Sequence, residues 1–250
     1  MFNAKQLLEQ FMGGQGGPAG GQEGGPAGGQ GGQSAGSGGF LSGAGGGALA
    51  GGLAALLLGS KAGRQIGGEA LKLGGMAAVG ALAYKAYNDW QSGKQAAPAT
   101  QAPQAPVAML PAPSGTPFNP STEAGQQTLA RHLLRAMIAA AKADGHVDAE
   151  EQARIFAEMD RLPLGADDKV FVMDELRAKL DVDAVAGAAA TPEEAAEIYT
   201  ASLLAIDVDN AAERGYLAML AARLKLDDGL VAHLHGGVAS ATGKSVPIAA

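Results

Sequence analysis

Apolar side chains from residue 119 onward recur three or four positions apart, and no stretch shows a convincing period of two. Thr191, Pro192 and Glu194 are an expected helix start, with threonine as the N-cap and proline in the first turn. The spacing predicts helices over about 121–143, from 148, over 166–180, 181–187, 191–206 and 210–223, and from 227. Residues 119–243 are therefore expected to form a compact all-α domain of five to seven helices with its own core.

The front of the chain has a different pattern. Residues 1–12 have apolar side chains near helical spacing, which predicts a short amphipathic helix that docks on a membrane or a partner, or else a frayed end. Residues 13–39 repeat a Gly-Gly-Pro-Ala-Gly-Gly-Gln unit and contain almost nothing apolar, which predicts a flexible tether. Residues 91–118 contain six prolines and are expected to form an extended spacer, and residues 244–250 a short tail.

Residues 40–90 are the expected membrane segment. Residues 40–60 are uncharged and mainly apolar, and a helix of about 20 such residues spans a bilayer. A stripe of small residues favours close approach of helices in lipid and therefore self-association. The stripe recurs every fourth position, at Gly43, Gly47, Gly51, Ala55 and Gly59.

A second Gly/Ala-rich stretch, residues 66–87, has three interpretations. It is the return arm of a membrane hairpin, an interfacial helix with Tyr84, Tyr87 and Trp90 at the headgroups, or a soluble helical hairpin that packs on itself. If residues 40–60 alone span, most basic residues of the front follow the span. The positive-inside bias then predicts that the C-terminal domain lies in the cytoplasm, the topology that we favour. If both stretches span, the basic loop is inside and both termini are outside.

Charge and composition narrow the function classes. The formal net charge is −7, and residues 119–243 contain 21 acidic and 11 basic side chains, which argues against a nucleic-acid partner. The absence of cysteine excludes disulfides, thiolate nucleophiles and cysteine-ligated zinc. The chain has no G-x-S-x-G, H-E-x-x-H or Walker motif. We therefore expect a non-enzymatic protein that acts through a membrane and protein partners.

Two acid-rich turns are the candidate chemical feature. Asp148 with Glu151, and Asn210 with Glu213, fit capping boxes, so capping alone explains these four residues. Asp144, Asp207 and Asp209 remain, at or just past helix C-termini, where the macrodipole disfavours negative charge.

A bound cation would compensate these charges. If the two helical hairpins pack about a pseudo-two-fold axis, their carboxylates form a site for Ca²⁺ or Mg²⁺. The candidate ligands are Asp144, Asp148, Glu151, Asp207, Asp209 and Glu213. Pure capping, without any ion, is the alternative.

The run Ala143-Asp144-Gly145-His146-Val147-Asp148-Ala149-Glu150-Glu151 and the segments 206–209 and 213–217 resemble the TerB-like tellurite-resistance domain family. The likeness is greatest to its YebE-type bacterial inner-membrane branch, whose function is unknown. The resemblance implies an all-α fold with two related halves, a divalent-metal site in the acidic turns, and a sensing or scaffold role under metal or envelope stress. It implies no catalytic residues.

Overall fold

The computed structural model describes residues 3–13, 75–96, 111–143, 166–206, 208 and 211–242. Within these ranges the protein is helical, and its β structure is limited to an isolated bridge between Thr116 and Asn119. The helices are α1 (Ala4–Gly13), α5 (Gly75–Gln91), α6 (Glu123–Ala141), α8 (Ala166–Arg177), α9 (Val182–Ala186), α10 (Pro192–Ala205), α11 (Ala211–Arg223) and α12 (Asp228–Thr242). The prediction of an all-α fold is confirmed for this part of the chain.

Local sequence signals determine where these helices begin. The Thr191 hydroxyl accepts a hydrogen bond from the Glu194 amide at 3.2 Å, and Pro192 occupies the first helical position. Thr122 caps α6 and Asp181 caps α9 in the same way. The Glu194 carboxylate accepts from the Ala190 amide at 2.9 Å, one residue before the cap. The expected helix starts near residues 121, 181 and 191 are thus confirmed.

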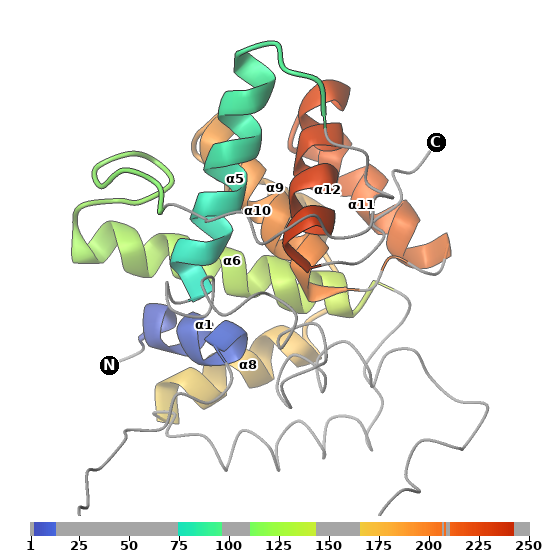
Figure 1. Ribbon diagram of the computed structural model, residues 1–250. Coiled ribbons are helices and arrows are strands. Elements are labelled where there is room, and N and C mark those ends of the chain that lie inside the picture. Colours follow the sequence, from blue (N-terminus) through green and yellow to red (C-terminus); the bar gives the residue numbers. More distant parts are fainter. Residues whose placement is uncertain are drawn as a thin grey trace, which may run out of the picture.

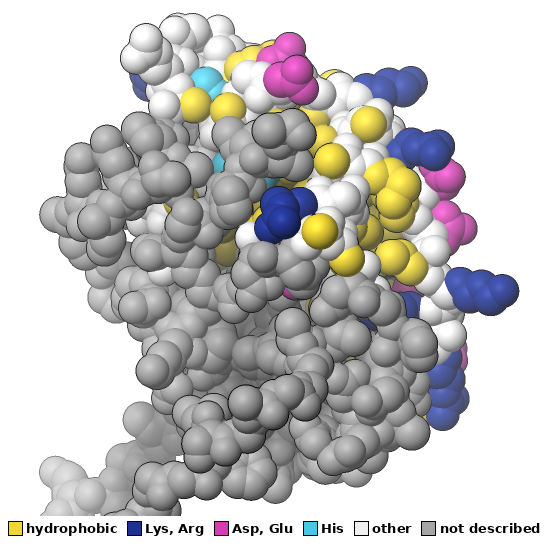
Figure 2. All heavy atoms as spheres, turned by 90° about the vertical axis from the view of Figure 1, so that its right-hand side faces the viewer, with side chains coloured by type: hydrophobic (Ala, Val, Ile, Leu, Met, Phe, Trp, Pro, Cys, Tyr) yellow, Lys and Arg dark blue, Asp and Glu magenta, His cyan; other side chains and the backbone are white. Residues whose placement is uncertain are grey.

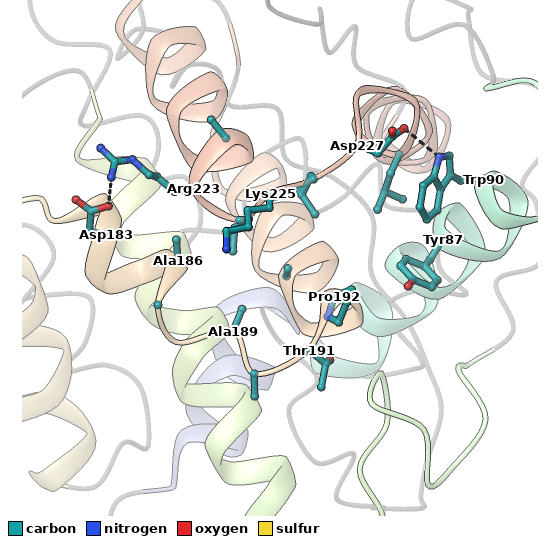
Figure 3. Close-up of a pocket in the computed structure, with 17 residues that line it drawn as sticks. Tyr87, Trp90, Asp183, Ala186, Ala189, Thr191, Pro192, Arg223, Lys225 and Asp227 are labelled. Carbon is teal, nitrogen blue, oxygen red and sulfur yellow. Dashed lines mark hydrogen bonds and ion pairs between the residues drawn. The ribbon is translucent and has the colours of Figure 1, made fainter.

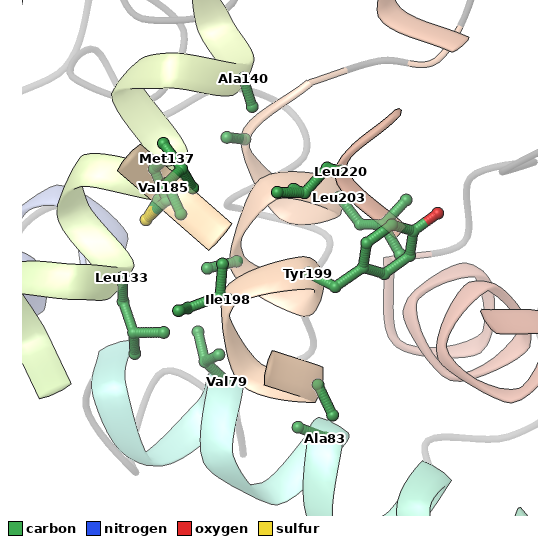
Figure 4. Close-up of a cluster of buried hydrophobic side chains, with 14 of the residues drawn as sticks. Val79, Ala83, Leu133, Met137, Ala140, Val185, Ile198, Tyr199, Leu203 and Leu220 are labelled. Atoms are coloured by element: carbon green, nitrogen blue, oxygen red, sulfur yellow. The ribbon is translucent and has the colours of Figure 1, made fainter. Parts of the chain in front are cut away.

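Helix α10 lies at the centre of the core (Figure 1). Nearly every side chain from Ala195 to Ala205 is buried, because other helices surround α10. Apolar side chains of α5, α6, α9 and α11 point toward it (Figure 4). Val79, Leu133 and Leu220 around α10 and Ile198 on α10 are fully buried, and each contributes about 1.5–3 kcal/mol of transfer free energy.

The expected N-terminal amphipathic helix exists as α1, but its apolar face packs against the protein itself. Leu7 and Leu8 are fully buried against α6 and α5. The Asn3 amide donates to Asp168 Oδ1 at 2.8 Å, and Lys5 Nζ donates to Gln126 Oε1 at 3.0 Å. The described residues of α1 are therefore part of the helical core, in place of the expected contact with a membrane or a frayed end.

Helix α5 also belongs to this core. It packs against α12 and α10 and buries Val79 completely. Tyr84 and Tyr87 both pack against Phe118, with ring centroids 5.6 Å apart in each pair. The interpretation of this stretch as a return arm or interfacial helix is therefore corrected for residues 75–91. The expected boundaries at residues 90 and 119 do not divide the packed core, since Phe118, at the end of the proline-rich spacer, is buried within it.

No helix in the described ranges is long and apolar enough to cross a bilayer. The uncharged stretch 40–60, most of the tether, residues 97–110 of the spacer and the tail lie outside those ranges. Residues 144–165, which contain the first acidic turn, lie outside them too, so the duplicated hairpin stays a prediction.

Candidate functional site

A groove of about 820 Å³ runs between the end of α5, helix α9, the start of α10 and the end of α11 (Figure 3). Tyr87 and Trp90 of α5 form one wall, and Ala186 and Ala189 line the opposite side. Lys225 lies between them. Residues of α5, α9, α10, α11 and α12 and of the loops 187–191 and 224–227 line the groove, so it exists only because these segments pack together.

The aromatic wall is held in place by Asp227. Its Oδ1 atom accepts hydrogen bonds from Trp90 Nε1 at 3.1 Å and from the Gly229 amide at 2.8 Å. The Trp90 ring lies 5.6 Å from that of Tyr87, centroid to centroid. Burial, with the nearby Glu193 charge, raises the pKa of Tyr87 above its ordinary value, which already lies well above neutral pH, so the hydroxyl of this wall is uncharged. The wall is a rigid apolar surface on which an apolar or proline side chain can pack.

An ion pair closes the other end of the groove. Arg223 Nη1 and Asp183 Oδ1 lie 2.6 Å apart, and both side chains are more than half exposed. Exposed pairs of this kind contribute only about 0–1 kcal/mol, because water and salt screen them. The pair therefore defines the rim of the groove without fixing it strongly.

Lys225 has an unusual backbone conformation for its residue type. Its φ is 56°, the left-handed region that usually belongs to glycine. The Leu226 amide donates to the Ala221 carbonyl at 3.0 Å and the Lys225 amide to the Ala222 carbonyl at 3.2 Å, which is a Schellman ending of α11. A lysine at this position costs about 1 kcal/mol relative to glycine. Its exposed side chain forms no hydrogen bond or ion pair with any described residue.

A second cavity, of about 410 Å³, lies between α11 and α12, with α10 as its floor. Tyr199 of α10 and His235 of α12 both line this cavity, and the tyrosine hydroxyl and His235 Nε2 are hydrogen bonded at 2.9 Å. The face of the molecule that carries α11 shows hydrophobic side chains scattered among charged ones (Figure 2). Met219 of α11, 44% exposed, is one of its large apolar side chains. This cavity offers fewer charged groups to a ligand than the groove.

Glu197 is a buried acid on the α5 side of α10. It is fully inaccessible, and neither carboxyl oxygen has a hydrogen-bond partner among the described residues. Burial, with the charge of Glu194, raises its pKa to about 9, so the group is neutral at physiological pH. Burial opposes ionisation of Glu194 too, but hydrogen bonds from His132 and the Ala190 amide lower its pKa. Glu194 therefore carries the charge and Glu197 does not.

The structure describes one of the six predicted metal ligands. Glu213 lies in the first turn of α11 and is 7% exposed, a position that suits both a cap and a ligand. The other five, Asp144, Asp148, Glu151, Asp207 and Asp209, lie outside the described residues. Within the described ranges no group of three histidine, aspartate or glutamate side chains is arranged to hold a metal ion. The Ca²⁺ or Mg²⁺ site therefore stays a prediction, which calorimetry with these ions would test.

The sequence did not reveal the groove. Trp90 was placed at lipid headgroups in one of the three interpretations of its segment, and Lys225 had no expected role. One signal was present: α11 ends at Arg223 with no glycine just beyond it, so a residue with a side chain must adopt the left-handed conformation. That signal becomes interpretable only once the end of α11 is known.

The described residues form an all-α fold, and comparison of the sequence with known protein families identifies the family of the chain. Residues 43–238 match the family described as "Protein of unknown function (DUF533)", and the chain belongs to that family. It is also 33% identical over 96 residues to a Yersinia enterocolitica protein described as "Uncharacterized protein in ampR 5'region". That alignment covers 38% of this chain and 69% of the relative. No solved structure matches, and the TerB-like resemblance stays a prediction.

Proposed function

We propose that this chain is a non-enzymatic, membrane-associated interaction module whose groove binds an acidic peptide segment of a protein partner. The observation that carries this proposal is Lys225. Its ammonium group lies in a groove between an aromatic wall and an alanine-lined wall, and it forms no ion pair with a described residue. A carboxylate of the partner pairs with Lys225, while a neighbouring apolar or proline side chain packs against Tyr87.

The backbone of Lys225 supports this assignment. Glycine would end α11 with less backbone strain than lysine. A contact between the Lys225 side chain and a ligand would explain why lysine occupies this strained position. Arg223 at the rim is a second basic group. A carboxylate of the peptide can replace Asp183 as its partner, because both side chains of the pair are exposed. The lining also contains Asp183 and Asp227, so the proposed preference for acidic peptides rests on Lys225.

The remaining parts of the proposal come from the sequence. The uncharged stretch 40–60 supports membrane association. The resemblance to TerB-like domains adds a sensing or scaffold role under metal or envelope stress, with a divalent cation at the acidic turns. The alternative is a soluble or peripheral interaction module in which the acidic turns only cap helices.

The groove can be tested through Trp90, the single tryptophan of the chain, whose fluorescence reports occupancy of the groove. The probes are two acetylated hexapeptides with proline and leucine, identical except that one has two glutamates and the other two glutamines. We expect a saturable change in fluorescence with the glutamate peptide. Lys225→Ala should weaken its binding about 3–5-fold at low salt, because a single exposed ion pair is lost.

Lys179→Ala is the matched control, since Lys179 is exposed and does not line the groove. It should bind the glutamate peptide as the wild-type chain does. Equal affinity for both peptides, or an unchanged affinity of the Lys225→Ala variant, would contradict the proposed recognition of acidic segments.

A further inference from the structure

We infer that protonated His233 ties the end of α5 to the start of α12, and that this bridge makes the proposed groove sensitive to pH. The His233 bridge consists of the His233 ring and the two backbone carbonyl oxygens that it faces. Loss of one proton from the ring breaks the bridge, loosens the aromatic wall and weakens the binding of an acidic peptide. The inference rests on the proposed function, because it adds regulation to the same groove.

Both ring nitrogens of His233 face carbonyl oxygens. Nδ1 lies 2.7 Å from the Gly229 carbonyl oxygen, one turn earlier in α12, and Nε2 lies 3.0 Å from the Lys94 carbonyl oxygen, just beyond α5. A carbonyl oxygen can only accept, so both nitrogens must donate, and only the imidazolium form has an N–H on each nitrogen. The neutral ring has a single N–H and therefore keeps one of the two hydrogen bonds.

The bond to Lys94 is the one that the neutral ring loses. The Nδ1 bond is the shorter of the two and lies within α12, whereas the Nε2 bond joins two different helical segments. After deprotonation the lone pair of Nε2 faces the Lys94 carbonyl oxygen, and two acceptors repel each other. The charged ring also forms stronger hydrogen bonds than the neutral ring. The proton on His233 therefore decides whether α12 is bonded to the residues that follow α5.

The Lys94 carbonyl is positioned by the end of α5. The Lys94 amide donates to the Asp89 carbonyl at 3.1 Å and the Gly93 amide to the Trp90 carbonyl at 2.9 Å, a Schellman ending with Gly93 at a φ of 67°. The Lys94 ammonium group also lies 2.6 Å from Asp89 Oδ1. These bonds join Lys94 to the last turn of α5, which carries Trp90, so a movement of Lys94 is transmitted to the aromatic wall.

Trp90 forms the second link between the same two segments (Figure 3). Its Nε1 donates to Asp227, which also accepts from the Gly229 amide in the first turn of α12. A Cβ atom at Gly229 would lie 3.3 Å from Trp90 Nε1, so the indole ring lies close against the start of α12. Once His233 releases Lys94, the exposed bond to Asp227 is the hydrogen bond that remains between the described ends of these helices. The wall is then held less firmly.

No other described side chain forms an ion pair with His233. The ionisable groups of the surrounding elements are Asp89 and Lys94 at the end of α5, Asp227, Asp228 and His235 of α12, and Glu193 and Glu197 of α10. Hydrogen bonds from Lys85 and Lys94 lower the pKa of Asp89, whereas burial raises that of Glu197 to about 9. Histidine is the side chain that ordinarily changes charge between pH 5 and pH 8, so a comparison of pH 6 with pH 8 tests the ring.

The free chain tests the bridge without any peptide. Trp90 is the single tryptophan, so quenching of its fluorescence by acrylamide reports how firmly the wall is held. We expect quenching of the full-length chain to be stronger at pH 8 than at pH 6. His233→Leu has no ring nitrogen and should be quenched at both pH values as the wild-type chain is at pH 8.

His132→Leu is the matched control. His132 lies on α6, where it is hydrogen bonded to Glu194, and it takes no part in the His233 bridge. This variant should keep the wild-type difference in quenching between pH 6 and pH 8.

Binding of the glutamate hexapeptide tests the consequence for the groove. The wild-type chain should bind it about 3–5-fold more weakly at pH 8 than at pH 6, the effect of one lost hydrogen bond. The glutamates of the peptide are ionised at both pH values, so they add no difference of their own. His233→Leu should bind the peptide equally at pH 6 and pH 8.

The outcomes separate the bridge from the proposed function. Equal quenching of Trp90 at both pH values, or a difference that persists in His233→Leu or disappears in His132→Leu, overturns the bridge whether or not the peptide binds. A normal quenching difference beside a peptide affinity that does not change with pH overturns the regulation of the groove. A normal quenching difference without any peptide binding refutes the proposed function and leaves the bridge itself supported.

Discussion

Helix α10 buries two ionisable side chains, Glu197 and Tyr199, that are two residues apart and face opposite sides of the helix. Tyr199 faces α12, where its hydroxyl is hydrogen bonded to His235. Glu197 faces α5, where its carboxyl group has no hydrogen-bond partner. Both side chains are at most 2% exposed, so burial alone does not distinguish them.

The difference lies in how each side offsets the loss of hydration. The α12 side provides a partner, so the tyrosine remains an ordinary buried polar group. The α5 side is built from glycine, alanine and apolar residues, and the acid is tolerated there because it keeps its proton. A core that accepts an unpartnered acid is destabilised whenever that acid must ionise. Burial also raises the pKa of the Tyr199 hydroxyl, so its ionisation lowers the stability only above about pH 10, where a tyrosine of the unfolded chain ionises.

The largest expected effect is therefore at Glu197. The unfolded chain releases this proton near pH 4.5, but the folded chain retains it to about pH 9, so the free energy of unfolding falls as pH rises between these values. The slope reaches at most about 1.4 kcal/mol per pH unit. Glu197→Gln should flatten this slope, and Glu197→Met should raise the stability at pH 8 by on the order of 2 kcal/mol. Urea denaturation from pH 5 to pH 9 measures both effects.

Glu123→Gln, at an exposed position in the first turn of α6, is the control and should leave the pH slope unchanged. A Glu197→Gln variant with the same slope as the wild-type chain would show that Glu197 is ionised in the folded state. The contrast with Tyr199 would then disappear.

A smaller effect is expected at Gly80, which faces Glu197 across the α5–α10 contact. A Cβ atom at this position would lie 2.6 Å from the Phe118 carbonyl oxygen and 3.2 Å from Glu197 Oε1. Gly80→Ala should therefore lower the midpoint of thermal unfolding and cost about 1–3 kcal/mol, as overpacked cores do.

Gly215→Ala on α11 is the matched control for this substitution. Its Cβ would meet nothing within 4 Å, so alanine should stabilise the helix by about 0.5–1 kcal/mol. A stabilising Gly80→Ala would mean that α5 packs less closely on α10 than the structure shows.

The smallest expected effect on stability is at Tyr199, on the side of α10 where the buried polar group has a hydrogen-bond partner. Tyr199→Phe removes the hydroxyl that is bonded to His235 and should cost about 1 kcal/mol in urea denaturation. Tyr216→Phe is its control, because the buried Tyr216 hydroxyl has no partner with hydrogen-bond geometry among the described residues. Equal costs at the two positions would show that the bond to His235 adds nothing, and that the two sides of α10 differ less than proposed.

The helices after residue 119 could be predicted closely because their signals are local. Thr191 and Pro192 start α10 where expected, and α6, α9 and α11 lie within two residues of their predicted starts. Capping and periodicity depend on neighbours along the chain, which the sequence contains in full.

The role of α5 could not be predicted in this way. Its Gly/Ala-rich sequence suits close helix packing in lipid and in a protein core equally well, because both surroundings are apolar. The candidate groove could not be predicted for a related reason: Trp90, the segment from Ala186 to Pro192, and Lys225 come from three distant parts of the chain.

The sequence by itself determined the all-α class, the starts of most of the later helices, and the presence of an uncharged stretch long enough for one membrane span. Only the tertiary structure decided that α1 and α5 share one core, that Glu197 stays protonated, and that Lys225 lies in a groove. The physical reason is that helix formation follows from neighbours along the chain, whereas burial and pKa depend on which distant segments pack together.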